Sequence, residues 1–158
     1  MKKITPFLWF NNNAEEAIAF YTSIFENSKL NSIAHYGDDI PGMKGKVINA
    51  QFTLDGQDFM ALDGGPNHPF SDATSFFVSC QDQAEVDKLW GKLTADGGEE
   101  GPCGWLKDKY GLSWQIIPVQ LNELMQDKDP QKVGRVVQAM LKMNKIIVKD
   151  LQDAYDNK

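Results

Sequence analysis

The sequence is poor in cysteine, in long hydrophobic runs and in clustered positive charge. Only two cysteines, Cys80 and Cys103, occur among 158 residues, and their spacing is not that of a zinc ligand pair. Two cysteines are also too few for a disulfide scaffold, so we expect two reduced thiols in a cytoplasmic protein. Cys103 is the thiol to test for reactivity, and the alternative is a small buried side chain.

Membranes and nucleic acids are poor matches to this composition. No stretch reaches the roughly 18 apolar residues of a membrane span, and the charged start at Lys2 and Lys3 leads into polar Asn11, Asn12 and Asn13, so we expect no signal peptide. The chain carries 16 basic and 22 acidic residues, a net charge of −6, and no basic stripe. Phosphate-rich partners need concentrated positive charge, which excludes nucleic acid and anionic membrane surfaces.

The first part of the chain reads as one helix among four strands. At 42% hydrophobic and 24% charged, the composition is that of a soluble globular protein. Periodicity predicts strands over 4–10, 30–36, 48–54 and 58–62, and an amphipathic helix over 14–25 that begins after Asn13 as its N-cap. Asp55-Gly56 predicts a tight hairpin between the last two of these strands.

The second part repeats this order. We predict a strand over 73–80, a helix over 82–95, short strands near Glu99 and over 105–107, and a strand over 112–118. Superposing the halves pairs Phe7 with Phe77 and Ala14 with Ala84. The fold class is therefore α+β, with two βαβββ modules, about 1–66 and 70–118, in one domain over residues 1–120.

Residues 121–158 form a helical C-terminal extension in this interpretation. Asp129-Pro130 can start a helix, and an apolar stripe runs from Val133 to Leu151. Two readings stay open, a docking helix for a partner subunit and a helix packed on its own domain.

Several sequence strings resemble one family. They are Phe7–Phe10 with Ala14–Ala17, Phe52–Gln57, Asp63–Pro66, and Cys103–Asp108 running into Gly111–Pro118. Together with the repeated βαβββ order they resemble the vicinal oxygen chelate superfamily, which includes glyoxalase I, extradiol dioxygenases and bleomycin-resistance proteins. Within it they are similar to the PhnB-like family, labelled 3-demethylubiquinone-9 3-methyltransferase. The resemblance implies that the modules form one cupped mixed sheet, and that the protein is a homodimer.

The resemblance also implies where active members hold a divalent metal. Those positions fall near Thr5 or Pro6, near Phe59–Ala61, near Ser75 and at Gln115. Only Gln115 could bind a metal, and one amide oxygen cannot hold a borderline or hard cation, so we expect no metal and no cofactor. A Rossmann-type methyltransferase would need a Gly-rich strand-to-helix turn, and Asp63–Pro66 precedes no predicted helix.

Alternation of period two predicts the residues that face the cup. Ile48, Ala50, Phe52 and Leu54 should face the helices. The candidate ligand-binding residues on the opposite face are Trp9, Asn49, Gln51, Thr53, Ser75, Phe77, Ser113 and Gln115. The alternative is a solvated sheet face. Lys107-Asp108 reads as a solvated surface pair.

The predicted function is metal-independent binding of a small organic molecule by this face. One alternative is a metal-assisted enzyme of the glyoxalase or dioxygenase type, and another is methyl transfer to a quinone-like acceptor.

Overall fold

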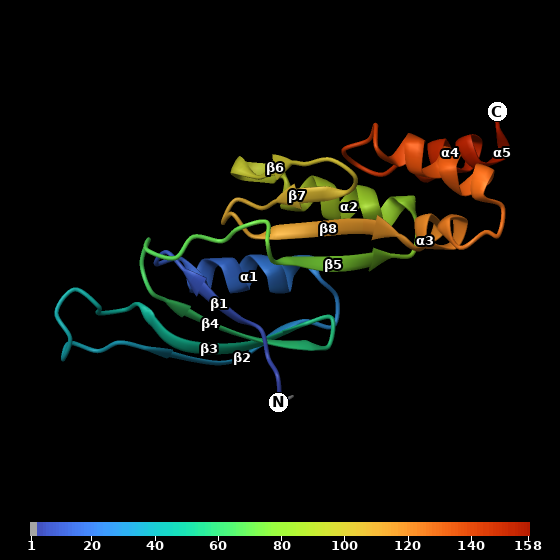
Figure 1. Ribbon diagram of the computed structural model, residues 1–158. Helices are drawn as coiled ribbons and strands as arrows, with labels where there is room; N and C mark the ends of the chain where they lie inside the picture. The colour runs from blue at the N-terminus through green and yellow to red at the C-terminus, as the bar shows by residue number, and fades with distance from the viewer. Residues whose placement is uncertain (1–2) are drawn as a thin grey trace. The chain divides into compact units, whose positions relative to one another are not determined.

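Each half of the chain folds into a four-stranded mixed sheet with a helix on one face, which confirms the predicted α+β class (Figure 1). The computed structural model describes residues 3–158 and divides them into a first unit that ends at Phe70 and a second unit, Ser71–Lys158. Within the described residues no strand ladder joins the two sheets, so each is open and has its own edge strands. No helix in residues 3–158 is long and apolar enough to cross a membrane.

The first unit consists of β1 (Phe7–Phe10), α1 (Ala14–Ile24), β2 (Lys29–His35), β3 (Val47–Leu54) and β4 (Gln57–Asp63). The strand order is β1-β4-β3-β2, with β1 parallel to β4 and the other pairs antiparallel. Asp55 (φ 43°) and Gly56 (φ 75°) form the predicted two-residue hairpin turn between β3 and β4. The core is the α1 face of this sheet, where Tyr21 and Phe52 are fully buried.

The start of α1 is held differently from the prediction. Asn13 is the N-cap residue, but its side chain accepts no capping hydrogen bond. The buried carboxylate of Asp63, at the end of β4, accepts from the Ala14 amide at 2.9 Å and from the Val47 amide at 2.9 Å. A carboxylate at a helix N-terminus also complements the helix dipole, so Asp63 takes over the role expected of Asn13.

The predicted orientation of Ile48 is wrong. Ala50, Phe52 and Leu54 are buried as predicted, but Ile48 is 40% exposed and Val47 is buried in its place. The reason is an extra residue in β3, because Ala34 pairs with Asn49 whereas His35 pairs with Val47. Such a bulge shifts the alternation by one residue and turns Ile48 out of the core.

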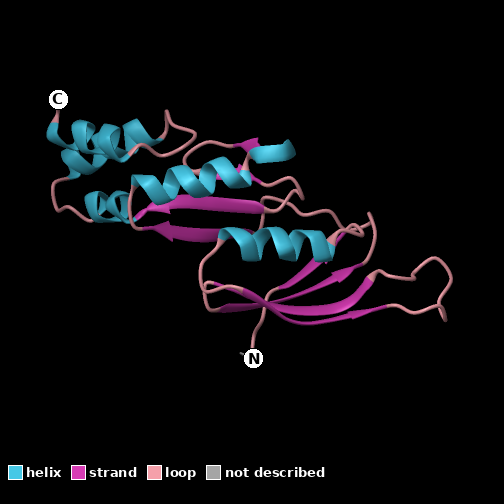
Figure 2. Ribbon diagram, turned by 180° about the vertical axis from the view of Figure 1, so that it is seen from behind, coloured by secondary structure: helices cyan, strands magenta, loops and turns pink. Residues whose placement is uncertain are grey.

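The second unit repeats the connectivity of the first. It contains β5 (Ser75–Cys80), α2 (Gln83–Leu93), a 3-10 turn η1 (Ala95–Gly97), β6 (Glu99–Glu100), β7 (Trp105–Lys107) and β8 (Ser113–Pro118). The strand order β5-β8-β7-β6 corresponds to β1-β4-β3-β2. Figure 2 shows α2 along one face of this sheet, where Trp114 and Ile116 are buried as predicted.

The C-terminal extension forms three helices, α3 (Val119–Met125), α4 (Pro130–Met140) and α5 (Val148–Asp156). The stripe from Val133 to Leu151 is thus interrupted, since the chain leaves helical geometry between α4 and α5. Val136, Ile146 and Leu151 form a buried cluster with Ile117 and Leu121 of the same unit. Of the two readings left open, the structure shows the extension packed on its own chain, and the homodimer stays a prediction.

Candidate ligand-binding site

The open face of the second sheet, opposite α2, carries two rows of side chains that cross the strands. Strand register places Ser75, Ser113, Lys107 and Glu99 side by side on β5, β8, β7 and β6. The next row on the same face contains Phe77, Gln115 and Trp105. One row is therefore polar and charged, and the other presents two aromatic rings and an amide.

A carboxylate from outside the sheet contacts two residues of the polar row. Asp72 accepts a hydrogen bond from the Ser113 hydroxyl at 2.8 Å and forms an ion pair with the Lys107 ammonium at 3.2 Å. The hydrogen bond from Ser113 and then the hydrogen bond from Lys107 lower the pKa of the Asp72 carboxyl below its ordinary value. Ser113 is only 1% exposed. The Gln115 amide nitrogen donates to the Ser75 hydroxyl at 2.9 Å.

A cavity of about 350 Å³ opens beside this polar row. Its lining residues are Asp72, Glu99, Glu100, Gly101, Pro102, Trp105, Leu106, Lys107 and Ser113. The volume is at the lower end of the range for small-molecule sites. Three carboxylates, from Asp72, Glu99 and Glu100, face a single ammonium, so the lining carries an excess of negative charge.

Trp105 differs from the other three tryptophans. The indole N–H groups of Trp9, Trp90 and Trp114 donate to Gly65 O, the Glu100 carboxylate and the Asp108 carboxylate at 2.8–2.9 Å. The Trp105 indole N–H has no hydrogen-bond partner within the described part of the chain, and this ring lines the cavity. The Glu99 carboxylate likewise has no ion-pair or hydrogen-bond partner among residues 3–158. Two of the cavity-lining side chains, Trp105 and Glu99, therefore have a donor and an acceptor that no group of residues 3–158 uses.

The predicted site residues fall into two groups. Ser75, Phe77, Ser113 and Gln115 share the open face of the second sheet, and Ser113 also lines the cavity. The predictions on the first sheet concern Trp9, Asn49, Gln51 and Thr53, which belong to the other unit. Each group is therefore described within its own unit.

On the first sheet two of the predicted residues already bind other groups of their own unit. Trp9 donates to Gly65 O at 2.9 Å, and a Cβ on Gly64 would lie 2.0 Å from its ring. Thr53 accepts from the Asn31 amide at 2.8 Å and donates to the Asp58 carboxylate at 3.2 Å. The buried side-chain oxygen of Asn49 has no partner within residues 3–158.

Of the nine lining residues, sequence reasoning named only Ser113 as a site residue, and for Lys107 it named the wrong partner. Lys107 pairs with Asp72, whereas Asp108 is buried, accepts from the Leu112 amide at 3.1 Å and accepts from the Trp114 indole at 2.8 Å. Alternation along β7 could have placed Trp105 and Lys107 on the same face. Asp72 lies in a loop, so no periodic signal identifies it.

The positions at which the fold family holds a divalent metal do not fit one here. The Gln115 amide nitrogen points to the Ser75 hydroxyl, and the position corresponding to Gln115 in the first unit is Met60. Hard and borderline cations need several carboxylate or imidazole ligands. No cluster of three or more His, Cys, Asp or Glu side chains with the right arrangement occurs among residues 3–158.

Comparison with known proteins identifies one family. The model of the 3-demethylubiquinone-9 3-methyltransferase family matches residues 2–117. The solved structure of the PhnB protein from Bacillus cereus is 43% identical, with a TM-score of 0.67 over 74% of this chain and 99% of that chain. No curated protein matches.

More distant structures share the fold. Protein PA1353 from Pseudomonas aeruginosa is 24% identical, with a TM-score of 0.61 over 75% of this chain and 98% of that one. The fosfomycin resistance protein FosX from Listeria monocytogenes, complexed with Mn(II) and 1S,2S-dihydroxypropylphosphonic acid, is 17% identical, with a TM-score of 0.52 over 72% of this chain and 90% of that one. These similarities concern the fold, and they agree with the predicted glyoxalase and bleomycin-resistance fold.

Proposed function

The chain belongs to the 3-demethylubiquinone-9 3-methyltransferase family, as the PhnB-like resemblance predicted, and from that premise we propose that it binds a small planar organic molecule in the second unit, without a metal. Methyl transfer, which the family name suggests, would need a site for a methyl donor. The Gly-rich segment Asp63–Pro66 begins at the last residue of β4, and the next regular element is the strand β5, so it does not form a strand-to-helix phosphate or cofactor turn.

One observation carries the proposal: the unused indole N–H of Trp105 at the cavity wall. Indole N–H groups usually find a hydrogen-bond partner when buried, as those of Trp90 and Trp114 do, and the half-buried Trp9 indole has one as well. A ligand that stacks on the ring and offers an acceptor to the N–H would satisfy it. The Glu99 carboxylate then accepts a donor from the same ligand.

The charge of the lining selects among ligands. Asp72 and Lys107 neutralise each other, and Glu99 and Glu100 remain as excess negative charge. Neutral or cationic rings are therefore favoured over anions. The phosphonic acid bound with Mn(II) in FosX is an anion that a metal can hold, and neither the lining charge nor the metal positions of this chain support the same ligand.

The test is a charge series on one ring: phenol, benzamidine and benzoate, measured by calorimetry. We expect phenol and benzamidine to bind, and benzoate to bind roughly three- to ten-fold more weakly because it meets excess carboxylates. Trp105→Ala should weaken phenol binding about ten-fold, through loss of stacking and one hydrogen bond. The matched control is Phe7→Ala, an aromatic ring of the first unit that is 50% exposed.

The same assay separates the alternatives. Stoichiometric uptake of Mn(II) would support a metal-assisted enzyme, and saturable binding of S-adenosylmethionine would support methyl transfer. Binding of no member of the ring series, or equal loss in Trp105→Ala and Phe7→Ala, would contradict the proposal.

A further inference from the structure

The loop between β6 and β7, residues 101–104, forms part of the cavity wall and has an unusual backbone. Gly101 and Pro102 line the cavity, and Trp105 follows the loop directly. Cys103 (φ 57°) and Gly104 (φ 84°) both adopt left-handed geometry. This geometry is unfavourable for a residue with a Cβ such as Cys103, so surrounding contacts must hold the loop in place.

Those contacts come from the C-terminal extension. The Cys103 amide donates to Met143 O at 2.8 Å, and the Gly104 amide donates to Asn144 O at 2.7 Å. A Cβ on Gly104 would lie 3.2 Å from the Ile146 side chain and 2.6 Å from that of Ile117, so only glycine fits this contact. We define residues 143–146 as the brace segment.

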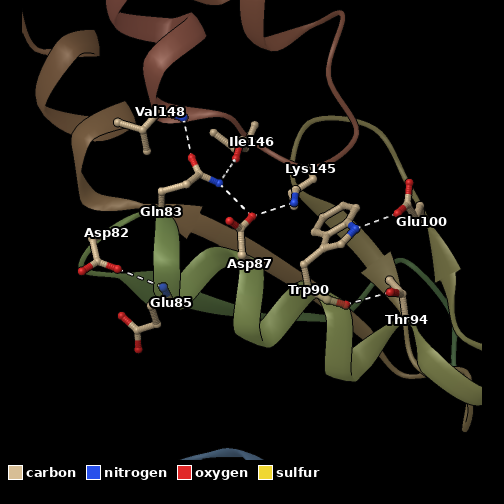
Figure 3. A network of polar contacts seen from close by, with 10 residues as sticks. All are labelled: Asp82, Gln83, Glu85, Asp87, Trp90, Thr94, Glu100, Lys145, Ile146 and Val148. Atoms are coloured by element: carbon tan, nitrogen blue, oxygen red, sulfur yellow. Dashed lines mark hydrogen bonds and ion pairs between the residues drawn. The ribbon is translucent and has the colours of Figure 1, made fainter.

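The brace segment is anchored in turn to α2, as Figure 3 shows. The Gln83 side chain donates to Ile146 O at 3.1 Å and accepts from the Val148 amide at 2.7 Å. Lys145 forms an ion pair with Asp87 at 2.6 Å. The polar atoms of the brace therefore face α2 on one side and the loop on the other.

The same helix reaches the cavity from a second direction. The Trp90 indole on α2 donates to the Glu100 carboxylate at 2.8 Å, and Glu100 lines the cavity (Figure 3). Residues of α2 thus support segment 100–104 at both of its ends. Trp90 binds Glu100 directly, and Gln83 and Asp87 bind the brace segment, which in turn binds Cys103 and Gly104. The direct end lies within residues 2–117 that the family model matches, whereas the brace lies outside them.

We infer that the brace segment fixes the 101–104 loop and Trp105 in their ligand-binding position, and that Gln83 is a positioning residue for this cavity. The consequence for ligand binding rests on the proposed function, whereas the effect on the loop does not. In this account the extension completes a site whose other parts belong to the family domain.

The test uses the full chain with Gln83→Ala, which removes the hydrogen bond to Ile146 of the brace and the hydrogen bond to the adjacent Val148 amide. The matched control is Gln152→Ala, a glutamine on α5 whose side chain bonds only to Asp156 within residues 3–158. We expect amide exchange at Cys103 and Gly104 to become roughly ten-fold faster in Gln83→Ala, because each lost hydrogen bond is worth a few-fold in an opening equilibrium. Phenol affinity should fall about five-fold, and neither quantity should change in the control.

Thiol labelling gives a second measurement that does not depend on a ligand. Cys80 is fully buried, and burial raises its pKa to about 12, so it should stay unreactive in native protein. Labelling of half-buried Cys103 should then accelerate in Gln83→Ala and not in Gln152→Ala. Unchanged exchange and labelling would overturn the inference. If the wild-type chain does not bind phenol but exchange is faster in Gln83→Ala, the proposed function is contradicted. The inference that the brace segment fixes the 101–104 loop then still stands.

Discussion

In the first unit the side chains at corresponding register on the open face are Phe7, Met60 and Gln51; in the second they are Phe77, Gln115 and Trp105. The charges in the neighbouring row differ between the units. Lys29 of the first unit corresponds to Glu99 of the second, and Asp58 of the first corresponds to Ser113 of the second. The duplicated topology therefore fixes where side chains stand and leaves their chemistry free.

The two units also secure their helices by different means. The start of α1 depends on Asp63, which lies at the end of β4, 49 residues from Ala14 in the sequence, and is 7% exposed. The start of α2 uses the local residue Asp82, which accepts from the Glu85 amide at 2.9 Å, while the Glu85 carboxylate accepts from the Gln81 amide at 2.7 Å. A long-range cap couples helix to sheet, and a local capping box does not.

Removing the acceptor at each helix start should distinguish the two units most strongly. Asp63→Ala leaves the amides of Ala14 and Val47 buried without acceptors and should cost about 3 kcal/mol of unfolding free energy. Asp82→Ala removes an exposed cap and should cost about 1 kcal/mol. Urea unfolding of both variants measures the two losses of unfolding free energy. Equal losses would show that the long-range cap stabilises the fold no more than the local one does.

On the open face of the second sheet, we expect a smaller effect from the loss of the Ser113 hydroxyl. The hydrogen bonds from Ser113 and Lys107 lower the pKa of Asp72 in the folded protein, so this carboxyl stabilises the fold above its unfolded pKa. That contribution is lost as the pH falls through the lowered folded-state value. In Ser113→Ala the Asp72 pKa should rise toward 3.8, its ordinary value.

Carboxyl carbon NMR over an acid titration measures this pKa. Asp72 should titrate at lower pH in the wild-type chain than in Ser113→Ala. An identical midpoint in both proteins would mean that the Ser113 hydrogen bond does not persist in solution.

The local hydrophobic pattern predicted the helices and strands of the two βαβββ modules correctly. The predictions that failed depend on contacts between distant segments. Alternation located β3 and β8 and assigned Phe52 and Trp114 to the core correctly, because one sheet face is buried under a helix. Alternation failed at Ile48, where a bulge inserts one residue. A bulge depends on pairing with another strand, so a single segment does not reveal it.

The same reason explains the errors in the cap and the extension. Asp63 lies 49 residues from the amide of Ala14 that it binds, and the sequence near α1 offered only Asn13. The apolar stripe from Val133 to Leu151 suggested one continuous face, but the carbonyls of Met143 and Asn144 bind the 101–104 loop and the chain leaves helical geometry there. The candidate site was only partly predicted because Asp72 enters it from a loop.

The indole N–H region of the NMR spectrum during a phenol titration tests whether the ligand binds at Trp105. Four tryptophans give four signals, and three of these groups already donate within the chain. We expect a saturable shift of the Trp105 indole signal while the Trp9 signal stays in place. A saturable shift of Trp9 with an unchanged Trp105 signal would place the ligand on the first sheet and contradict the account.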